Sequence, residues 1–86
     1  MTTNYQKGRN KEYRIKQRHE KEGWEVVRSA GSHSPFDLIC IRAVDQRIKF
    51  IQCKSKNFSK KEEERLLKKY NWLKDGIFLT DYEIIR

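Results

Sequence analysis

Three polar residues interrupt apolar segments that have the length of β-strands. Asp37 follows a turn-rich loop at the head of one such segment, and Gln52 and Lys54 lie two residues apart in the next. Because alternate residues of a strand share a face, Gln52 and Lys54 should point the same way. A buried charge is costly unless a partner or a metal compensates it. We therefore expect these three side chains to meet one another or a metal ion.

This combination suits the metal-assisted hydrolysis of a phosphodiester bond. A carboxylate can hold a hard cation such as Mg²⁺, which polarises the phosphate and lowers the pKa of a bound water. A lysine can position that water or stabilise the developing charge. The alternative is a cross-strand ion pair between Asp37 and Lys54 at the rim of an ordinary sheet, and each residue taken alone fits it better. Their joint arrangement favours the catalytic interpretation.

The segments around these residues predict an α/β fold with a mixed β-sheet flanked by helices, in the order αβββαβ. The helices are expected at 9–22 and 60–73, and the strands at 24–30, 36–43, 48–55 and 77–81. Gly23 can close the first helix in a left-handed conformation, and Ser59 with Glu62 has the spacing of a capping box. The segment 36–43 is apolar on both alternating sets, with Phe36 and Leu38 in the same one, which is typical of a central strand covered on both faces.

The chain is small and strongly basic. It has 20 Lys and Arg against 12 Asp and Glu, a net charge of +8 over 86 residues, which favours a polyanionic partner. Nucleic acid and an anionic membrane both fit this charge, but the apolar runs are too short to span a bilayer, so we expect no insertion in a membrane and take DNA as the partner. The N-terminal segment 1–8 is basic and polar, without the pattern of a signal peptide, and predicts a cytoplasmic protein.

The apolar content predicts self-association. Residues 1–86 form one domain at most, and a hydrophobic fraction of 36% leaves a small core that a homodimer would extend. We expect the interface at large apolar residues that the monomer has little left to cover: Tyr70, Trp72, Ile84 and Ile85. Trp24 and the reduced thiols of Cys40 and Cys53 are expected in the core, and His19 is expected in solvent.

Four blocks of the sequence carry a resemblance to a known family. They are Lys7-Gly8-Arg9 with Glu12, the run GWEVVRSAGS at 23–32, Pro35-Phe36-Asp37, and Ile51-Gln52-Cys53-Lys54. In their order and approximate spacing they resemble the archaeal Holliday junction resolvases of the PD-(D/E)xK nuclease superfamily. The resemblance implies a small restriction-endonuclease-like core and a homodimer that cuts two strands of a four-way DNA junction with Mg²⁺ or Mn²⁺.

The resemblance also implies roles for individual residues. The catalytic set would be Glu12, Asp37, Gln52 and Lys54, with Glu12, Asp37 and Gln52 as the metal ligands. The DNA-binding set would include Lys7, Arg9, Arg28, Ser29 and Ser32. To these we add the basic residues Arg14 and Lys56 and the loop residue His33, which could bond a phosphate. Gln52 departs from the family, which usually has Glu there, because an amide offers a carbonyl oxygen without charge.

Two other functions fit the same residues. The chain could be a catalytically silent DNA-binding protein of this fold, or a nuclease for other branched, nicked or foreign DNA. Retention of Glu12, Asp37 and Lys54 favours an enzyme, because acidic groups beside phosphate would only weaken a pure binder.

Overall fold

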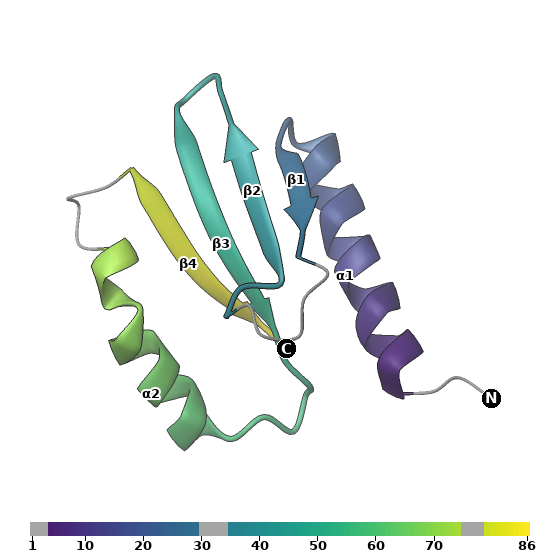
Figure 1. Cartoon of the computed structure of the whole chain (residues 1–86), viewed down its shortest axis with the longest axis vertical. Coiled ribbons are helices and arrows are strands. Elements are labelled where there is room, and N and C mark those ends of the chain that lie inside the picture. Colours follow the sequence, from purple (N-terminus) through teal and green to yellow (C-terminus); the bar gives the residue numbers. More distant parts are fainter. Residues whose placement is uncertain (1–3, 30–34, 75–78) are drawn as a thin grey trace.

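The structure is a computed structural model that describes residues 4–29, 35–74 and 79–86, and it has a four-stranded mixed sheet with two helices (Figure 1). The elements are α1 (Asn4–Lys21), β1 (Glu25–Arg28), β2 (Leu38–Arg42), β3 (Arg47–Cys53), α2 (Lys60–Lys69), the 3₁₀ turn η1 (Asn71–Leu73) and β4 (Thr80–Ile85). The strands lie in the order β1-β2-β3-β4, antiparallel except for the parallel pair β3 and β4. The predicted α/β class, mixed sheet and element order are confirmed.

Helix α1 begins at Asn4, earlier than predicted, so much of the basic segment 1–8 is helical. It ends as expected: Gly23 has a φ of 91°, and the Trp24 amide donates to the His19 carbonyl over 3.0 Å. The expectation of a solvated His19 is wrong, because its side chain is only 3% exposed. His19 lies one turn after Ile15 on the stripe that faces the sheet, and its Nδ1 lies 2.8 Å from the Ile15 carbonyl oxygen.

Each face of the sheet has its own apolar cluster. The cluster under α1 contains Ile15, Trp24, Val26, Leu38, Cys40 and Ile51, with Cys53 and Ile85 packed against it. The cluster under α2 contains Leu66, Tyr70, Leu73 and Tyr82, with Phe36, Phe50, Phe58 and Ile84 packed against it. Trp24 and Cys40 therefore lie in the core as predicted, and both cysteines are free thiols.

Two predictions about the strand 36–43 are wrong. Phe36 does not share a cluster with Leu38, because it precedes the start of β2 and packs on the opposite side against Phe50, with 4.7 Å between ring centroids. Nor is the strand covered on both faces, since Ile41 remains 44% exposed. The reason is that the second cluster is built largely on β3 and β4, which leaves the β1 and β2 half of that face open.

The C-terminal half of the chain also differs in detail from the prediction. Helix 60–73 divides into α2 and η1, and the last strand runs from Thr80 to Ile85 rather than over 77–81, of which 77 and 78 lie outside the described residues. Tyr82, 1% exposed, fixes that strand against β3. Half of the capping box is present, because Ser59 Oγ accepts the Glu62 amide over 3.0 Å while the Glu62 carboxylate binds Arg65.

The monomer covers more of the expected dimer residues than predicted. Tyr70 is buried against Phe36 and Tyr82, and Ile84 and Ile85 are half-buried against the two clusters. The premise that the monomer leaves Tyr70 uncovered is therefore wrong, because Tyr70, at the C-terminal end of α2, packs its ring against Phe36 and Tyr82. Trp72, by contrast, is 49% exposed. Within the described ranges, no helix is long and apolar enough to cross a membrane.

Candidate active site

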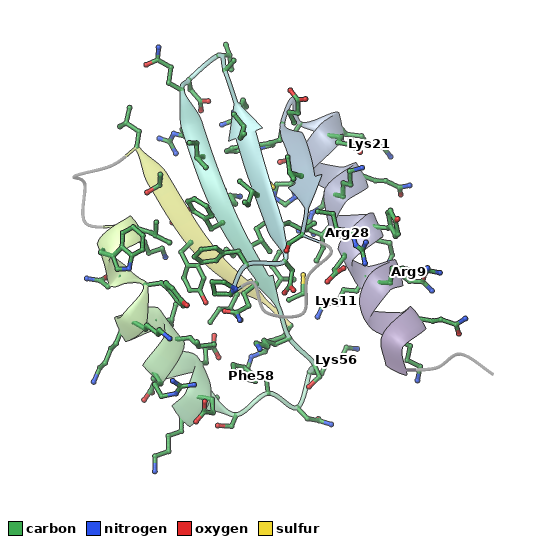
Figure 2. The ribbon with its side chains drawn as sticks, viewed as in Figure 1. Arg9, Lys11, Lys21, Arg28, Lys56 and Phe58 are labelled. Carbon is green, nitrogen blue, oxygen red and sulfur yellow. The ribbon has the colours of Figure 1, made fainter. Side chains whose placement is uncertain are left out.

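A basic groove lies at the end of the sheet between the first half of α1 and the segment that follows β3. Its volume is about 1270 Å³. Six of its lining residues are cationic: Lys7, Lys11, Arg14, Lys54, Lys56 and Arg86. Among the described residues that line it, only Glu12 has a carboxylate side chain. Lys11 extends from α1 toward the end of the sheet, and Lys56 lies on the loop after β3 (Figure 2). This groove should therefore attract a polyanion.

Asp37 is fixed at the end of the strands that border the groove. Its amide donates to the Ile51 carbonyl over 2.9 Å, and its carbonyl accepts the Ser29 amide over 2.9 Å. Its carboxylate Oδ2 accepts the Cys53 amide over 2.7 Å. The Asp37 carboxylate thus accepts a hydrogen bond where the pairing of β2 with β3 ends. The hydrogen bonds of Asp37 connect the start of β2 to β3 and to the end of β1.

Glu12 reaches the same region from α1 and binds Arg28 of β1. The Glu12 Oε2 and Arg28 Nε atoms are 2.8 Å apart, in a pair largely shielded from solvent. The Arg28 guanidinium also lies 5.2 Å from the centroid of the Tyr13 ring. Figure 2 shows Arg28 between β1 and α1. The predicted catalytic acid and a predicted phosphate contact are therefore partners in the free protein.

The Cys53 thiol lies within electrostatic range of Asp37, Glu12 and Lys11. Burial raises its pKa to about 12, and the negative charges of Asp37 and Glu12 add to that rise. The positive charge of Lys11 opposes it. Both carboxylates and Lys11 are therefore close enough to act on one half-buried sulfur atom, and the thiol itself stays protonated near neutral pH.

Gln52 and Lys54 have other partners. Gln52 is 9% exposed, and its Oε1 accepts the Tyr82 hydroxyl over 2.6 Å, on the face of the sheet covered by α2. Lys54 Nζ lies 5.2 Å from the centroid of the Phe58 ring. In the described part of the chain, the hydrogen bonds of Asp37, Gln52 and Lys54 do not join these three side chains to one another. The charge of Asp37 acts on the Cys53 thiol together with the charge of Glu12, and it also acts on Tyr82, whose hydroxyl binds Gln52.

The predicted DNA-binding residues fall into three groups. Lys7, Arg14 and Lys56 line the basic groove. Arg9 is exposed on α1, Arg28 binds Glu12, and Ser29 is half-buried beside Asp37. Ser32 and His33 lie outside the described residues.

The sequence interpretation missed two cations of the groove, Lys11 and Arg86. Lys11 Nζ donates to the Lys54 carbonyl over 2.6 Å, and Arg86 forms an ion pair with Glu63. A signal for Lys11 was present, because it precedes Ile15 by one helical turn on the stripe of α1 that faces the sheet.

The chain is also similar to a known family. A family model for archaeal Holliday junction resolvases matches residues 3–74. The chain belongs to the archaeal Holliday junction resolvase family. The match spans α1 through η1 and includes every residue predicted to be catalytic. Searches of curated proteins and of solved structures gave no match. Membership in this resolvase family assigns the chain to the nucleases that act on DNA junctions.

The carboxylates of the candidate site fit Mg²⁺ as part of a ligand set rather than as a complete one. In the residues that the structure describes, no three His, Cys, Asp or Glu side chains are grouped as a ready-made metal cage. Asp37 and Glu12 nonetheless approach the same thiol from two elements. Mg²⁺ is commonly held by one or two carboxylates together with water and substrate phosphate. The site therefore fits an ion whose coordination a bound phosphate completes.

Proposed function

We propose that this member of the resolvase family is a Mg²⁺- or Mn²⁺-dependent endonuclease that cuts four-way DNA junctions as a homodimer. The observation that carries the proposal is the basic groove, which gathers six cationic side chains around Glu12 and ends at the strand termini that hold Asp37. The cations would bind the DNA backbone, and the two carboxylates would stand where hydrolysis needs a metal.

Each side chain would then have a separate task. Asp37 and Glu12 would hold the ion, which when bound polarises the phosphate and lowers the pKa of a water. Arg28 holds Glu12 in the free protein and would exchange it for a phosphate oxygen, since guanidinium groups bind phosphate and carboxylate alike. Lys54 lines the groove and would donate to the phosphate as negative charge develops.

The homodimer rests on symmetry and on exposed apolar surface. A four-way junction has approximate two-fold symmetry, and a two-fold dimer would place one active site on each of two opposed strands. Trp72 and Ile41 are 49% and 44% exposed. Burying such side chains against a second copy would stabilise a domain of this size.

A second candidate, DNA binding without cleavage, is favoured by two contacts. The Gln52 oxygen is engaged by Tyr82, and Glu12 is engaged by Arg28. Both contacts compete with metal binding. The nuclease and the silent DNA-binding protein would use the same groove, and they differ only in whether the bound DNA is cleaved.

The test uses a labelled four-way junction and a linear duplex with the sequence of one arm, each with Mg²⁺, Mn²⁺ or EDTA. The proposal predicts paired cuts in the junction with either ion, none with EDTA, and little cutting of the duplex. Tight junction binding with no cutting in either ion would select the silent binder. Equal cutting of nicked or flapped DNA would select a nuclease with a different substrate.

A further inference from the structure

Lys11 occupies an unusual position for a helical lysine. Its ammonium reaches across from α1 to the first residue after β3, where it donates to the Lys54 carbonyl over 2.6 Å in a partly buried contact. The side chain lines the basic groove, and its charge acts on the Cys53 thiol together with the charges of Glu12 and Asp37. Lys11 is therefore held at the strand end that carries Lys54, within electrostatic range of the same thiol as the two carboxylates.

The Lys54 carbonyl uses only one of the three protons of this ammonium. The remaining two can be donated to phosphate oxygens. Holding a long side chain in place before binding removes part of the entropy that a free lysine loses when it binds. Partial burial also strengthens the attraction between an ammonium and a phosphate relative to the same pair in water.

The positive charge of Lys11 also matters for the repulsion between the site's carboxylates and DNA. Glu12 and Asp37 would repel a DNA backbone that enters the groove, and Gln52 adds no charge of its own. Lys11 offsets that repulsion, because its positive charge acts on the Cys53 thiol in the opposite sense to the charges of Glu12 and Asp37.

We propose that Lys11 forms a preorganised phosphate-binding site in the groove, with its ammonium held by the Lys54 carbonyl and its remaining protons donated to a backbone phosphate of the bound strand. The inference rests on DNA binding in the groove, which is part of the proposed function, and does not depend on cleavage. It gives Lys11 a role that its neighbours on the exposed side of α1 lack.

The test measures the Kd for a four-way junction at several salt concentrations in EDTA, so that no cleavage is involved. Lys11→Met removes the charge and keeps the aliphatic stem. Loss of one phosphate contact should make the slope of log affinity against log salt shallower by about 0.9. Binding at low salt should weaken roughly tenfold, as for a charged hydrogen bond. Lys11→Arg should restore most of both.

Lys21 provides the matched control, because it is exposed at the opposite end of the same helix (Figure 2). Lys21→Met should leave the slope and the affinity near those of the parent. Lys11→Gln is a second test variant, since it removes the charge but keeps a hydrogen-bonding side chain, one bond shorter than lysine. It should show the same shallower slope as Lys11→Met.

A parental slope in Lys11→Gln would overturn the proposal, as would a Lys11→Met variant that loses thermal stability but binds with an unchanged salt dependence. Either result would limit Lys11 to linking α1 and β3. Failure of the wild-type protein to cut junctions would refute the proposed nuclease function and leave this binding result standing.

Discussion

At the scale of single residues, the ion pair between Glu12 and Arg28 joins a proposed metal ligand to a proposed phosphate contact. Each partner neutralises the other at 2.8 Å, so neither is fully available for its proposed task before DNA arrives. A phosphate that draws Arg28 away would release Glu12 toward the metal. Metal binding and DNA binding should therefore strengthen each other.

This coupling predicts the behaviour of Arg28→Gln. The substitution frees the Glu12 carboxylate, so Mn²⁺ affinity without DNA should rise several-fold, by an amount typical of coupled sites. Junction affinity should fall, because one phosphate contact is lost. Electron paramagnetic resonance of free Mn²⁺ gives the first quantity and a DNA-binding titration the second. An unchanged Mn²⁺ affinity would mean that Glu12 does not ligate the ion.

Gln52 supports a second prediction at this scale. In Gln52→Glu the new carboxylate can accept the Tyr82 hydroxyl as the amide does. The charge of Asp37 also acts on Tyr82, so the proposed site would gain a second negative charge in this region. The Mg²⁺ concentration for half-maximal cleavage should fall roughly tenfold, because ligand charge sets the affinity of such sites. Thermal stability in EDTA should drop by about 1 to 3 kcal/mol, since the buried charge lacks a counterion. An unaltered Mg²⁺ requirement would place Gln52 outside the ligand set.

At the scale of elements, helix α1 shows where local signals suffice and where they fail. Gly23 predicted the end of α1, because a left-handed residue is a local requirement. The start at Asn4 was missed, since polar residues there fit a helix and a loop equally well. His19 was expected in solvent because polar side chains usually are, and only its place on the stripe of Ile15 shows otherwise.

The candidate site was likewise only partly predictable from the sequence. Asp37 and Lys54 could be chosen from sequence, because a polar residue within an apolar strand is conspicuous. The partners of Glu12 and Gln52 could not, since the contacts with Arg28 and Tyr82 join elements distant in the chain. The predicted bounds of the last strand were wrong for a related reason. Strand β4 pairs in parallel with β3, which is distant in the chain, so local sequence signals do not fix where β4 begins and ends.

Two glycines of the α1 region offer a matched pair of substitutions. Gly8 lies within the helix with open space around its Cα, so Gly8→Ala should stabilise the fold by about 0.5 to 1 kcal/mol. Gly23 has a φ of 91°, so Gly23→Ala should destabilise it by about 1 to 2 kcal/mol. Urea unfolding of both variants measures the two shifts. Shifts of the same sign would contradict the assigned end of α1.

At the scale of the whole molecule, the sheet is covered unevenly. Helix α1 lies over one face, whereas the second cluster covers mainly β3 and β4 and leaves Ile41 exposed on β2. Trp72 is a further large apolar side chain in solvent. The net charge of +8 opposes association of two copies, so apolar contacts must outweigh that repulsion in a dimer.

The proposed dimer predicts a sedimentation result. At micromolar concentration the chain should sediment at twice its monomer mass of 10.5 kDa. Trp72→Ser should shift it toward the monomer without unfolding it, because Trp72 contributes little to the monomer core. Its circular dichroism spectrum should match the parent. A parent that remains monomeric at that concentration would remove the dimer from the proposal.

The central claim is that the basic groove with Asp37 at its end is the active centre of a junction nuclease. The most direct measurement is the single-turnover rate of junction cleavage in Mg²⁺ for Asp37→Asn, beside Asp45→Asn as a control from the turn between β2 and β3. The asparagine at 37 keeps an oxygen for the Cys53 amide, so the fold should persist. We predict that Asp37→Asn binds the junction like the parent and cuts it at least about a hundredfold more slowly, a loss of roughly 2.7 kcal/mol in transition-state stabilisation, while Asp45→Asn cuts normally. Cleavage by Asp37→Asn at the parental rate would contradict the claim.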